Sequence, residues 1–261
     1  MSKKIVYAIG DVHGRADLLN AIMAHAVADA AIHDATPIFI FLGDICDKGP
    51  QSRQAMDAVA EALIDYEGSI VLKGNHDDLF LKAIYERDRR YAAAWMSRGG
   101  METLASYYAG DLNEAVEFVR TMHGDHLRMF ANAKPMATVE GIVFAHAGID
   151  PLVSLADQTE KNLMWIRDPF LDHVGRLQNI IVHGHTVVGD LPVVTENRIS
   201  IDTGAYHSGR LTAVAIDNGS FRFFQTDGSS KSVVDVEPVL LDRGLGTAIE
   251  KHECIEFALA A

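Results

Sequence analysis

Short apolar runs recur along the chain, and the first five each lead into a cluster of polar residues. They span residues 5–9, 38–42, 70–72, 142–145 and 180–182. Runs of this length that are rich in isoleucine and valine are typical of buried strands. Two longer segments with helical patterns, at about residues 16–31 and 52–66, separate the first three runs. This alternation predicts a β-α-β-α-β unit with parallel strands and right-handed crossovers.

Two further patterns follow this unit. Residues 78–133 are rich in Ala, Leu, Met, Tyr, Arg and Glu and contain no proline, which predicts several inserted helices that cap or wall a cleft. Runs at 198–201, 211–216 and 221–225, with a turn at 217–220, predict a hairpin and a second, more antiparallel sheet. We expect one α/β catalytic domain over residues 1–261, with the helical insertion at about 78–133. A C-terminal extension at about 229–261 should hold a strand near 233–240 and a short helix after it.

Five polar clusters follow the apolar runs, and each pairs glycine with residues that can bind a metal ion. The clusters are Gly10-Asp11-Val12-His13-Gly14, Gly43-Asp44-Ile45-Cys46-Asp47-Lys48-Gly49, Gly74-Asn75-His76-Asp77, His146-Ala147-Gly148 and His183-Gly184-His185-Thr186. Asp, His and Asn supply the oxygen and nitrogen ligands that Mn²⁺, Fe and Zn²⁺ accept, and glycine permits tight turns beside an ion. Parallel strands gather such side chains at their carboxyl ends. The series predicts a two-metal phosphate site.

The spacing of the ligands suggests how the two ions are shared. Asp11 and His13 lie two residues apart, so on an extended segment they project to the same side and can bind one ion. Asp44 can bridge that ion to a second, whose shell would be completed by Asn75, His146 and His185. Two ions about 3.5–4 Å apart can lower the pKa of a bridging water and hold its hydroxide in line with phosphorus. We therefore expect direct hydrolysis without a phosphorylated enzyme.

Two residues near these ligands are predicted to move a proton. His76 is not needed to complete a metal shell, so we expect it to protonate the leaving oxygen. Asp47 is expected to orient His76 and to favour its protonated form.

Phosphate binding requires fixed positive charge and hydrogen-bond donors. Arg167, in Trp165-Ile166-Arg167-Asp168, is the main candidate because its planar fork can hold two phosphate oxygens; the alternative is a salt bridge with Asp168. Lys48 and Lys73 would add point charges, and the Asn75 amide would contact the same oxygens.

Composition narrows the partners and the compartment. Lys and Arg total 23 against 36 Asp and Glu, a formal net charge of −13, which argues against a duplex nucleic acid as substrate. The apolar run at residues 5–9 is too short for a signal peptide or a membrane span, so we expect a cytoplasmic protein without membrane contact. The two cysteines, Cys46 and Cys254, lack the spacing of a zinc or disulfide framework, which predicts reduced thiols.

The clusters resemble the phosphoprotein phosphatase family of metallophosphoesterases, whose signature is Gly-Asp-x-His-Gly, Gly-Asp-x-x-Asp-Arg-Gly and Gly-Asn-His-Glu/Asp followed by two separate histidines. The resemblance spans about residues 5–225. It implies a calcineurin-like β-sandwich of two mixed sheets flanked by helices, the ligand set described above and the Asp47–His76 pair. Residues 146–149, 165–167 and 201–205 look like bacterial and phage serine/threonine phosphatases, and also like symmetrical diadenosine tetraphosphatase.

Two departures from the family pattern concern positive charge. Lys48 and Lys73 stand where the family usually has arginine, which predicts weaker substrate binding or a different leaving-group preference.

Two competing functions are disfavoured. A phosphodiesterase would commonly continue as Gly-His-x-His, and here Thr186-Val187 follows His185, which favours monoesters. A catalytically silent binding module is disfavoured because every expected ligand is present, as are Asp47 and His76.

The sequence therefore predicts a serine/threonine protein phosphatase with two divalent ions, expected to be Mn²⁺, with Fe or Zn²⁺ as alternatives. The alternative functions are a symmetrical dinucleoside tetraphosphatase or another small-molecule phosphatase or phosphodiesterase of the superfamily. The expected partner is a phosphorylated protein or a small phosphoester, and the oligomeric state stays open.

Overall fold

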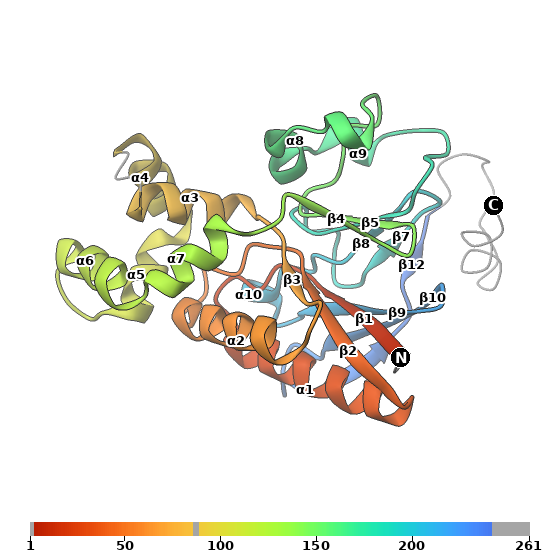
Figure 1. Cartoon of the computed structure of the whole chain (residues 1–261), viewed down its shortest axis with the longest axis horizontal. Helices are drawn as coiled ribbons and strands as arrows, with labels where there is room; N and C mark the ends of the chain where they lie inside the picture. Colours follow the sequence, from red (N-terminus) through yellow and green to blue (C-terminus); the bar gives the residue numbers. More distant parts are fainter. Residues whose placement is uncertain (1–2, 86–88, 242–261) are drawn as a thin grey trace.

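The computed structural model describes residues 3–85 and 89–241, which form two six-stranded sheets with helices on their outer faces (Figure 1). The strand orders are β11-β10-β9-β1-β2-β3 and β12-β7-β8-β6-β5-β4. Both sheets are mixed, because each contains parallel and antiparallel pairs. The expected α/β sandwich of two mixed sheets is therefore confirmed.

The first sheet is built on the unit that the apolar runs predict. Its strands are β1 (Lys3–Ile9), β2 (Ala35–Phe41), β3 (Ile70–Val71), β9 (Thr212–Asp217), β10 (Ser220–Thr226) and β11 (Val233–Val236). Strands β1, β2 and β3 are parallel neighbours, and α1 (Ala16–Ile32) and α2 (Ser52–Asp65) connect them. The predicted β-α-β-α-β unit is confirmed.

The second sheet differs from the predicted one. Its strands are β4 (Met136–Val139), β5 (Ile142–Ala145), β6 (Ile181–His183), β7 (Val193–Val194), β8 (Arg198–Ser200) and β12 (Val239–Leu240). The prediction that the runs at 198–201, 211–216 and 221–225 share a second sheet is wrong, because β9 pairs antiparallel with β1 in the first sheet and β10 follows it. The reason is burial: β9 is apolar on both faces, as the centre of a covered sheet requires, and pattern alone does not reveal its neighbour.

The predicted strand near residues 233–240 is two short strands, one in each sheet. Strand β11 pairs with β10, and β12 pairs with β7. Residues 237 and 238 connect them, so the chain passes from one sheet to the other at Pro238. The helix expected after this point, and Cys254, lie outside the described residues.

Alternation along β1 explains how the layers pack. Val6 and Ala8 face the core between the sheets, where they meet Phe144 and Val182 of the second sheet. Tyr7 and Ile9 point the other way, into the core beneath α1 and α2. A third core lies on the outer face of the second sheet, under α8 (Glu160–Trp165) and α9 (Asp168–Leu171).

Helices fill the stretch that was predicted to be helical. They are α3 (Asn75–Ile84), α4 (Arg89–Trp95), the π-helix Met96–Gly100, α5 (Met101–Tyr107), α6 (Leu112–Met122) and α7 (Gly124–Ala131), and they gather on one side of the molecule (Figure 1). The remaining helices are the 3-10 turn Leu155–Asp157 and α10 (Ala205–Ser208). None of the helices in the described part of the chain is both long enough and apolar enough to cross a membrane.

Candidate metal centre

The predicted ligands lie just after β1, β2, β3, β5 and β6, with Asn75 as the first residue of α3, and the fold brings them together where the two sheets meet. Two groups of side chains have ligand atoms that all lie within 4.8 Å of one another. One contains His13, Asp44 and His76, and the other contains Asp44, His146 and His185. Asp44 belongs to both groups, as expected for a residue that bridges two ions.

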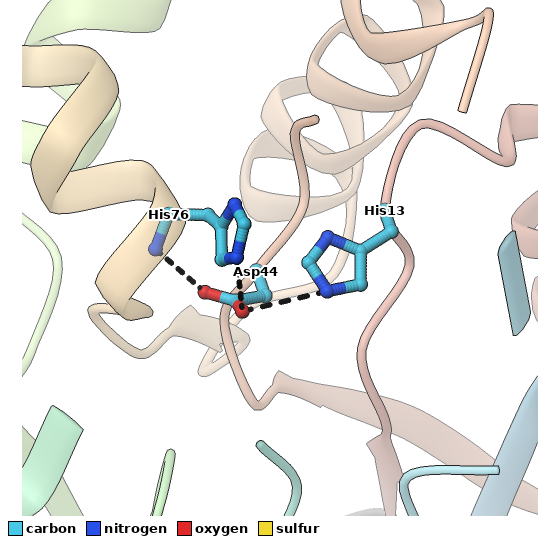
Figure 2. A group of neighbouring side chains, drawn as sticks. All are labelled: His13, Asp44 and His76. Atoms are coloured by element: carbon cyan, nitrogen blue, oxygen red, sulfur yellow. Dashed lines mark hydrogen bonds and ion pairs between the residues drawn. The ribbon is translucent and has the colours of Figure 1, made fainter. Parts of the chain in front are cut away.

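Figure 2 shows the first group around the Asp44 carboxylate. His13 Nε2 lies 3.5 Å from Asp44 Oδ2 and 4.0 Å from Asp11 Oδ2. The other His13 nitrogen, Nδ1, lies 2.9 Å from the Cys46 carbonyl oxygen, so Nδ1 carries the proton and Nε2 presents a lone pair to the cluster. This arrangement suits a ligand atom beside two carboxylates.

The second group places three acceptors against one another. His146 Nδ1 donates to the Leu42 carbonyl oxygen at 2.8 Å, which leaves Nε2 bare at 3.0 Å from Asn75 Oδ1 and 3.4 Å from Asp44 Oδ1. His185 Nδ1 lies 2.9 Å from the same Asn75 oxygen. His185 Nε2 is buried and has no hydrogen-bond partner in the described part of the chain. Facing lone pairs and an unsatisfied ring nitrogen fit a bound cation.

The pKa values of the buried carboxylates and imidazoles also favour a bound cation. Burial, together with repulsion from Asp202 and Asp44, raises the pKa of Asp11 well above its ordinary value. Burial would also raise the pKa of Asp44, but the surrounding histidines lower it below its ordinary value. Burial lowers the pKa values of His13 and His185 to about 3, so both imidazoles are neutral and available as ligands. A divalent cation would relieve the repulsion between the carboxylates.

Several of these residues have unusual backbone conformations. The φ angles of His13, Asp44, Asp47, Lys48 and His185 are 44°, 51°, 73°, 67° and 64°. Each non-glycine residue in this left-handed region costs about 1–2 kcal/mol. The surrounding structure must therefore stabilise these loops, and the strain marks the region as functional.

Asp77 holds one of the strained loops. Its carboxylate accepts hydrogen bonds from the backbone N–H groups of Asp44 at 2.7 Å and Ile45 at 3.0 Å. Burial and the charge of Asp44 raise the pKa of Asp77 to about 7. Gly74 is required beside this loop, because a Cβ there would collide with the Asp44 backbone and carboxylate. The Gly74-Asn75-His76-Asp77 cluster contains Asp77, but its sequence pattern did not predict this role.

His76 and Asp47 form the predicted contact. His76 Nδ1 lies 2.7 Å from Asp47 Oδ2, and His76 Nε2 lies 4.0 Å from Asp44 Oδ2. Burial would lower the pKa of His76, but the charges of Asp44 and Asp47 and the Asp47 hydrogen bond raise it above its ordinary value. The ring is therefore prepared to hold a proton beside the metal ligands.

Asp47 is held by two residues of the helical insertion. Its Oδ1 accepts hydrogen bonds from Trp95 Nε1 at 2.8 Å and from the Thr103 hydroxyl at 2.6 Å. Trp95 is 1% exposed, so its ring belongs to the core while its Nε1–H bonds to Asp47. The role of Thr103 was not predicted, because nothing in the helical pattern around it distinguishes it from its neighbours.

The predicted phosphate-binding cations are distributed around the centre. Lys48 Nζ lies 2.8 Å from His13 Nε2 and 4.8 Å from the centre of the Tyr206 ring. Lys73 Nζ lies 3.1 Å from Glu160. Arg167 is exposed at the start of α9 and close enough to add to the lowering of the His185 pKa, after burial and His146. Within residues 3–85 and 89–241, no ion pair joins Arg167 to Asp168.

Three further residues are buried near the ligands but are not among the predicted ligands. His183 is buried, with Nε2 2.7 Å from Ser200 Oγ and Nδ1 3.0 Å from the Gly184 carbonyl oxygen, so neither ring nitrogen is free for a metal. Asp202 is buried next to Asp11, and the Ile201-Asp202-Thr203-Gly204 segment could have drawn attention to it. Cys46 is a buried free thiol whose pKa is raised well above its ordinary value by burial, which makes it inert.

The chain is similar in sequence to proteins named as bis(5'-nucleosyl)-tetraphosphatase and as serine/threonine-protein phosphatase. The chain is 27% identical over 227 residues to an asymmetrical bis(5'-nucleosyl)-tetraphosphatase PrpE of Anoxybacillus flavithermus, covering 79% of this chain and 88% of the relative. It is 25% identical over 217 residues to serine/threonine-protein phosphatase 2 of Escherichia coli, covering 79% of this chain and 90% of the relative.

Solved structures support the fold. A cold-active protein-tyrosine phosphatase of a psychrophilic Shewanella species superposes with a TM-score of 0.55 at 18% identity, over 90% of this chain and 81% of that one. A protein serine/threonine phosphatase of Saccharomyces cerevisiae superposes with a TM-score of 0.52 at 10% identity, over 92% and 81%.

The sequence also matches the calcineurin-like phosphoesterase family over residues 5–215, which include every predicted ligand. That family is metal-dependent, and the lone pairs and carboxylates at the meeting point of the two sheets suit divalent ions. This chain belongs to the calcineurin-like phosphoesterase family of metallophosphoesterases.

Proposed function

We propose that the protein is a serine/threonine protein phosphatase that hydrolyses phosphomonoesters with the help of two divalent ions. The observation that carries the proposal is the His76–Asp47 pair, which lies directly beside the two ligand groups that share Asp44. Such a pair serves the departure of an alcohol, which is the leaving group of phosphoserine and phosphothreonine. The relative named serine/threonine-protein phosphatase 2 supports this assignment.

Six residues would hold the ions. Asp11, His13 and Asp44 would bind the first, and Asp44, Asn75, His146 and His185 would bind the second. The ions, for which we propose Mn²⁺, would supply Lewis acidity at the phosphate oxygens and lower the pKa of the attacking water. The mixed oxygen and nitrogen donors also accept Fe or Zn²⁺.

His76 would complete the reaction by transferring a proton. Water forms the new bond to phosphorus while the bond from phosphorus to the serine or threonine oxygen breaks. His76 Nδ1–H donates to Asp47, so the proton on Nε2 is the one given to the departing oxygen. Trp95 and Thr103 keep Asp47 aligned for this task.

Positive side chains would bind the phosphate. Arg167 is the proposed bidentate contact, since it is exposed beside His185 without an ion pair to Asp168 in the described part of the chain. Lys48 lies closest to the ligands, whereas Lys73 shares its charge with Glu160 at the rim. The Asn75 amide would add a hydrogen bond to the same oxygens.

A second candidate function is hydrolysis of a bis(5'-nucleosyl) tetraphosphate. Two exposed aromatic rings flank the centre: Trp165 stands edge-on to His185 and Tyr206 stands edge-on to His13. Such rings can stack on a nucleobase. The relative named as a tetraphosphatase is called asymmetrical, whereas the sequence motifs looked like the symmetrical type, so the position of cleavage belongs to the test.

Initial rates on three substrates distinguish these functions. Metal-stripped protein resupplied with Mn²⁺ is assayed on a phosphoserine/phosphothreonine peptide, a phosphotyrosine peptide and diadenosine tetraphosphate, with His76→Asn as the control. The proposal predicts peptide turnover that is reduced about 10²–10⁴-fold in the variant. Turnover of the dinucleotide alone would contradict it, and the products would then show the cleavage position: ADP only for symmetrical cleavage, ATP and AMP for asymmetrical cleavage.

A further inference from the structure

A second cluster of metal-binding side chains lies away from the phosphatase centre, where the helical insertion meets α2. Asp57 of α2 and two histidines at the junction of α6 and α7, His123 and His126, have ligand atoms that all lie within 4.8 Å of one another. Helix α7 packs against α2 (Figure 1). The proposed function uses none of these residues.

His126 presents an unsatisfied nitrogen to this cluster. The residue is fully buried, and its Nε2 makes no hydrogen bond of acceptable geometry within the described part of the chain. Asp57 Oδ1 lies 3.0 Å from Nε2, but outside the direction that a ring N–H would need. A buried imidazole nitrogen that is aimed at a carboxylate without bonding to it requires an explanation.

The opposite ring nitrogen of His126 is held by Tyr107 of the helical insertion. Tyr107 Oη lies 2.6 Å from His126 Nδ1 and 3.0 Å from Met56 Sδ. When the tyrosine hydroxyl donates to Met56 Sδ, its oxygen can accept from His126 Nδ1–H, and Nε2 then faces Asp57 as a lone pair. A hydrogen bond of this kind at the far ring nitrogen orients the imidazole of a metal ligand.

A hydrogen bond from the His126 ring to Asp57 would be the simplest alternative. The 3.0 Å contact between His126 Nε2 and Asp57 Oδ1, however, does not have the geometry of such a hydrogen bond. A cation bound between the ring nitrogen and the carboxylate would satisfy both groups.

We infer that Asp57, His123 and His126 form a zinc site that joins the helical insertion to α2. Two imidazoles and one carboxylate are a donor set that Zn²⁺ prefers, and water would complete a tetrahedral shell. Asp57 and His123 are only half-buried, which gives the ion a path from solvent and lets both side chains close around it. The site is independent of the proposed function.

Zinc content tests the inference. The full chain is dialysed against buffered Zn²⁺, and bound zinc is measured in the wild type, His123→Ala and Asp57→Asn. Each variant should bind about one equivalent less than the wild type, since loss of a ligand removes the site. His33→Ala and Glu61→Gln are matched controls, because both residues are exposed and lie outside the cluster. Both controls should keep the wild-type zinc content.

Two further measurements make the result decisive. Zinc should raise the midpoint of thermal unfolding more in the wild type and controls than in the two variants, because an ion that binds only the folded state stabilises it. Phosphoester turnover should be equal in all five proteins, which shows that the variants are folded and that the phosphatase centre is intact. Equal zinc content and equal zinc-induced shifts in the wild type and both variants would overturn the inference.

Discussion

The two sheets contribute unequal halves to the candidate metal centre. The first sheet supplies the carboxylates of Asp11 and Asp44 and the His76–Asp47 pair, whereas the second supplies two imidazoles, His146 and His185. Even these imidazoles are oriented by the first half. His146 donates to the Leu42 carbonyl, and the His185 backbone N–H donates to the Asp11 carboxylate. The candidate metal centre therefore lies between the two sheets, and residues of the first sheet orient the imidazoles that the second sheet supplies.

The largest predicted effect is a loss of bound metal, and it should differ between variants of the first sheet and variants of the second. Asp44→Asn removes the only carboxylate shared by both ligand groups of the centre, so both ions should be lost and turnover should fall by more than about 10³-fold. His185→Ala should remove one ion and leave the other, because the first group keeps its ligands. Metal analysis of purified proteins with parallel rate measurements checks this. Equal metal content in the two variants would contradict the unequal halves.

A smaller effect is expected at Trp95, the residue of the helical insertion that holds Asp47. Trp95→Phe removes a hydrogen bond to the Asp47 carboxylate, which is worth about 2 kcal/mol, or about thirtyfold in kcat, with KM unchanged. The chain's other tryptophan gives a matched control: Trp165→Phe changes an exposed ring and should alter KM without lowering kcat. Steady-state kinetics of both variants test the pair. A KM change in Trp95→Phe with unchanged kcat would show that Trp95 lines the cleft instead.

A third prediction concerns the outer face of the first sheet, where a substitution should lower the stability of the protein without changing its activity. Asp29 of α1 accepts hydrogen bonds from Arg222 of β10, at 2.7 Å from Nη2, and from Tyr7 of β1, also at 2.7 Å. Burial would raise the pKa of Asp29, but Arg222 and Tyr7 lower it below its ordinary value. Because Arg222 is about one-third exposed, solvent screens part of this interaction, and Asp29→Asn should cost about 1.5 kcal/mol at pH 7.

The sign of the pH dependence follows from the lowered pKa. A carboxyl group with a depressed folded-state pKa contributes its stability above the unfolded value of about 4 and loses it as the pH falls. The stability difference between wild type and Asp29→Asn should therefore shrink below about pH 4. Urea unfolding at pH 7 and pH 3.5 measures it, and phosphatase rates at pH 7 should be equal. A difference that grows with acidity would refute the assignment.

The smallest effects are expected at the two lysines. Lys48 lies 2.8 Å from His13, so Lys48→Arg should restore a bidentate contact and lower KM about threefold. Lys73 pairs with Glu160 at the rim, so Lys73→Arg should change KM less than about twofold. Peptide kinetics rank the two variants. A larger change at Lys73 would place the phosphate nearer the rim than the ligand geometry suggests.

Local rules explain which parts of the fold were predictable. Strands β1, β2 and β3 are consecutive in sequence and adjacent in space, so the crossover rule was sufficient for their order. Strand β9 lies beside β1 although more than 200 residues separate them, and no local pattern encodes such pairing. The ligands share this logic, because each follows a strand end and all except His146 stand next to glycine, and the fold brings all of them together.

The residues that support the centre were harder to find. Trp95 and Thr103 reach Asp47 from an insertion whose path depends on tertiary packing. The left-handed conformations of Asp44 and Asp47 lie at non-glycine positions, so sequence gave no signal of strain. The roles of the predicted ligands and of Arg167 stay predictions until the ions and the substrate are bound.

Metal titration of metal-stripped protein tests most directly whether the candidate metal centre between the sheets binds two ions. Mn²⁺ is added in increments, and turnover of a phosphoserine/phosphothreonine peptide is measured at each increment. The account predicts little activity at one equivalent and full activity as the second ion binds, with the same titration giving no activity in Asp44→Asn. Full activity in stripped protein without added metal, or an Asp44→Asn variant as active as the wild type, would contradict it.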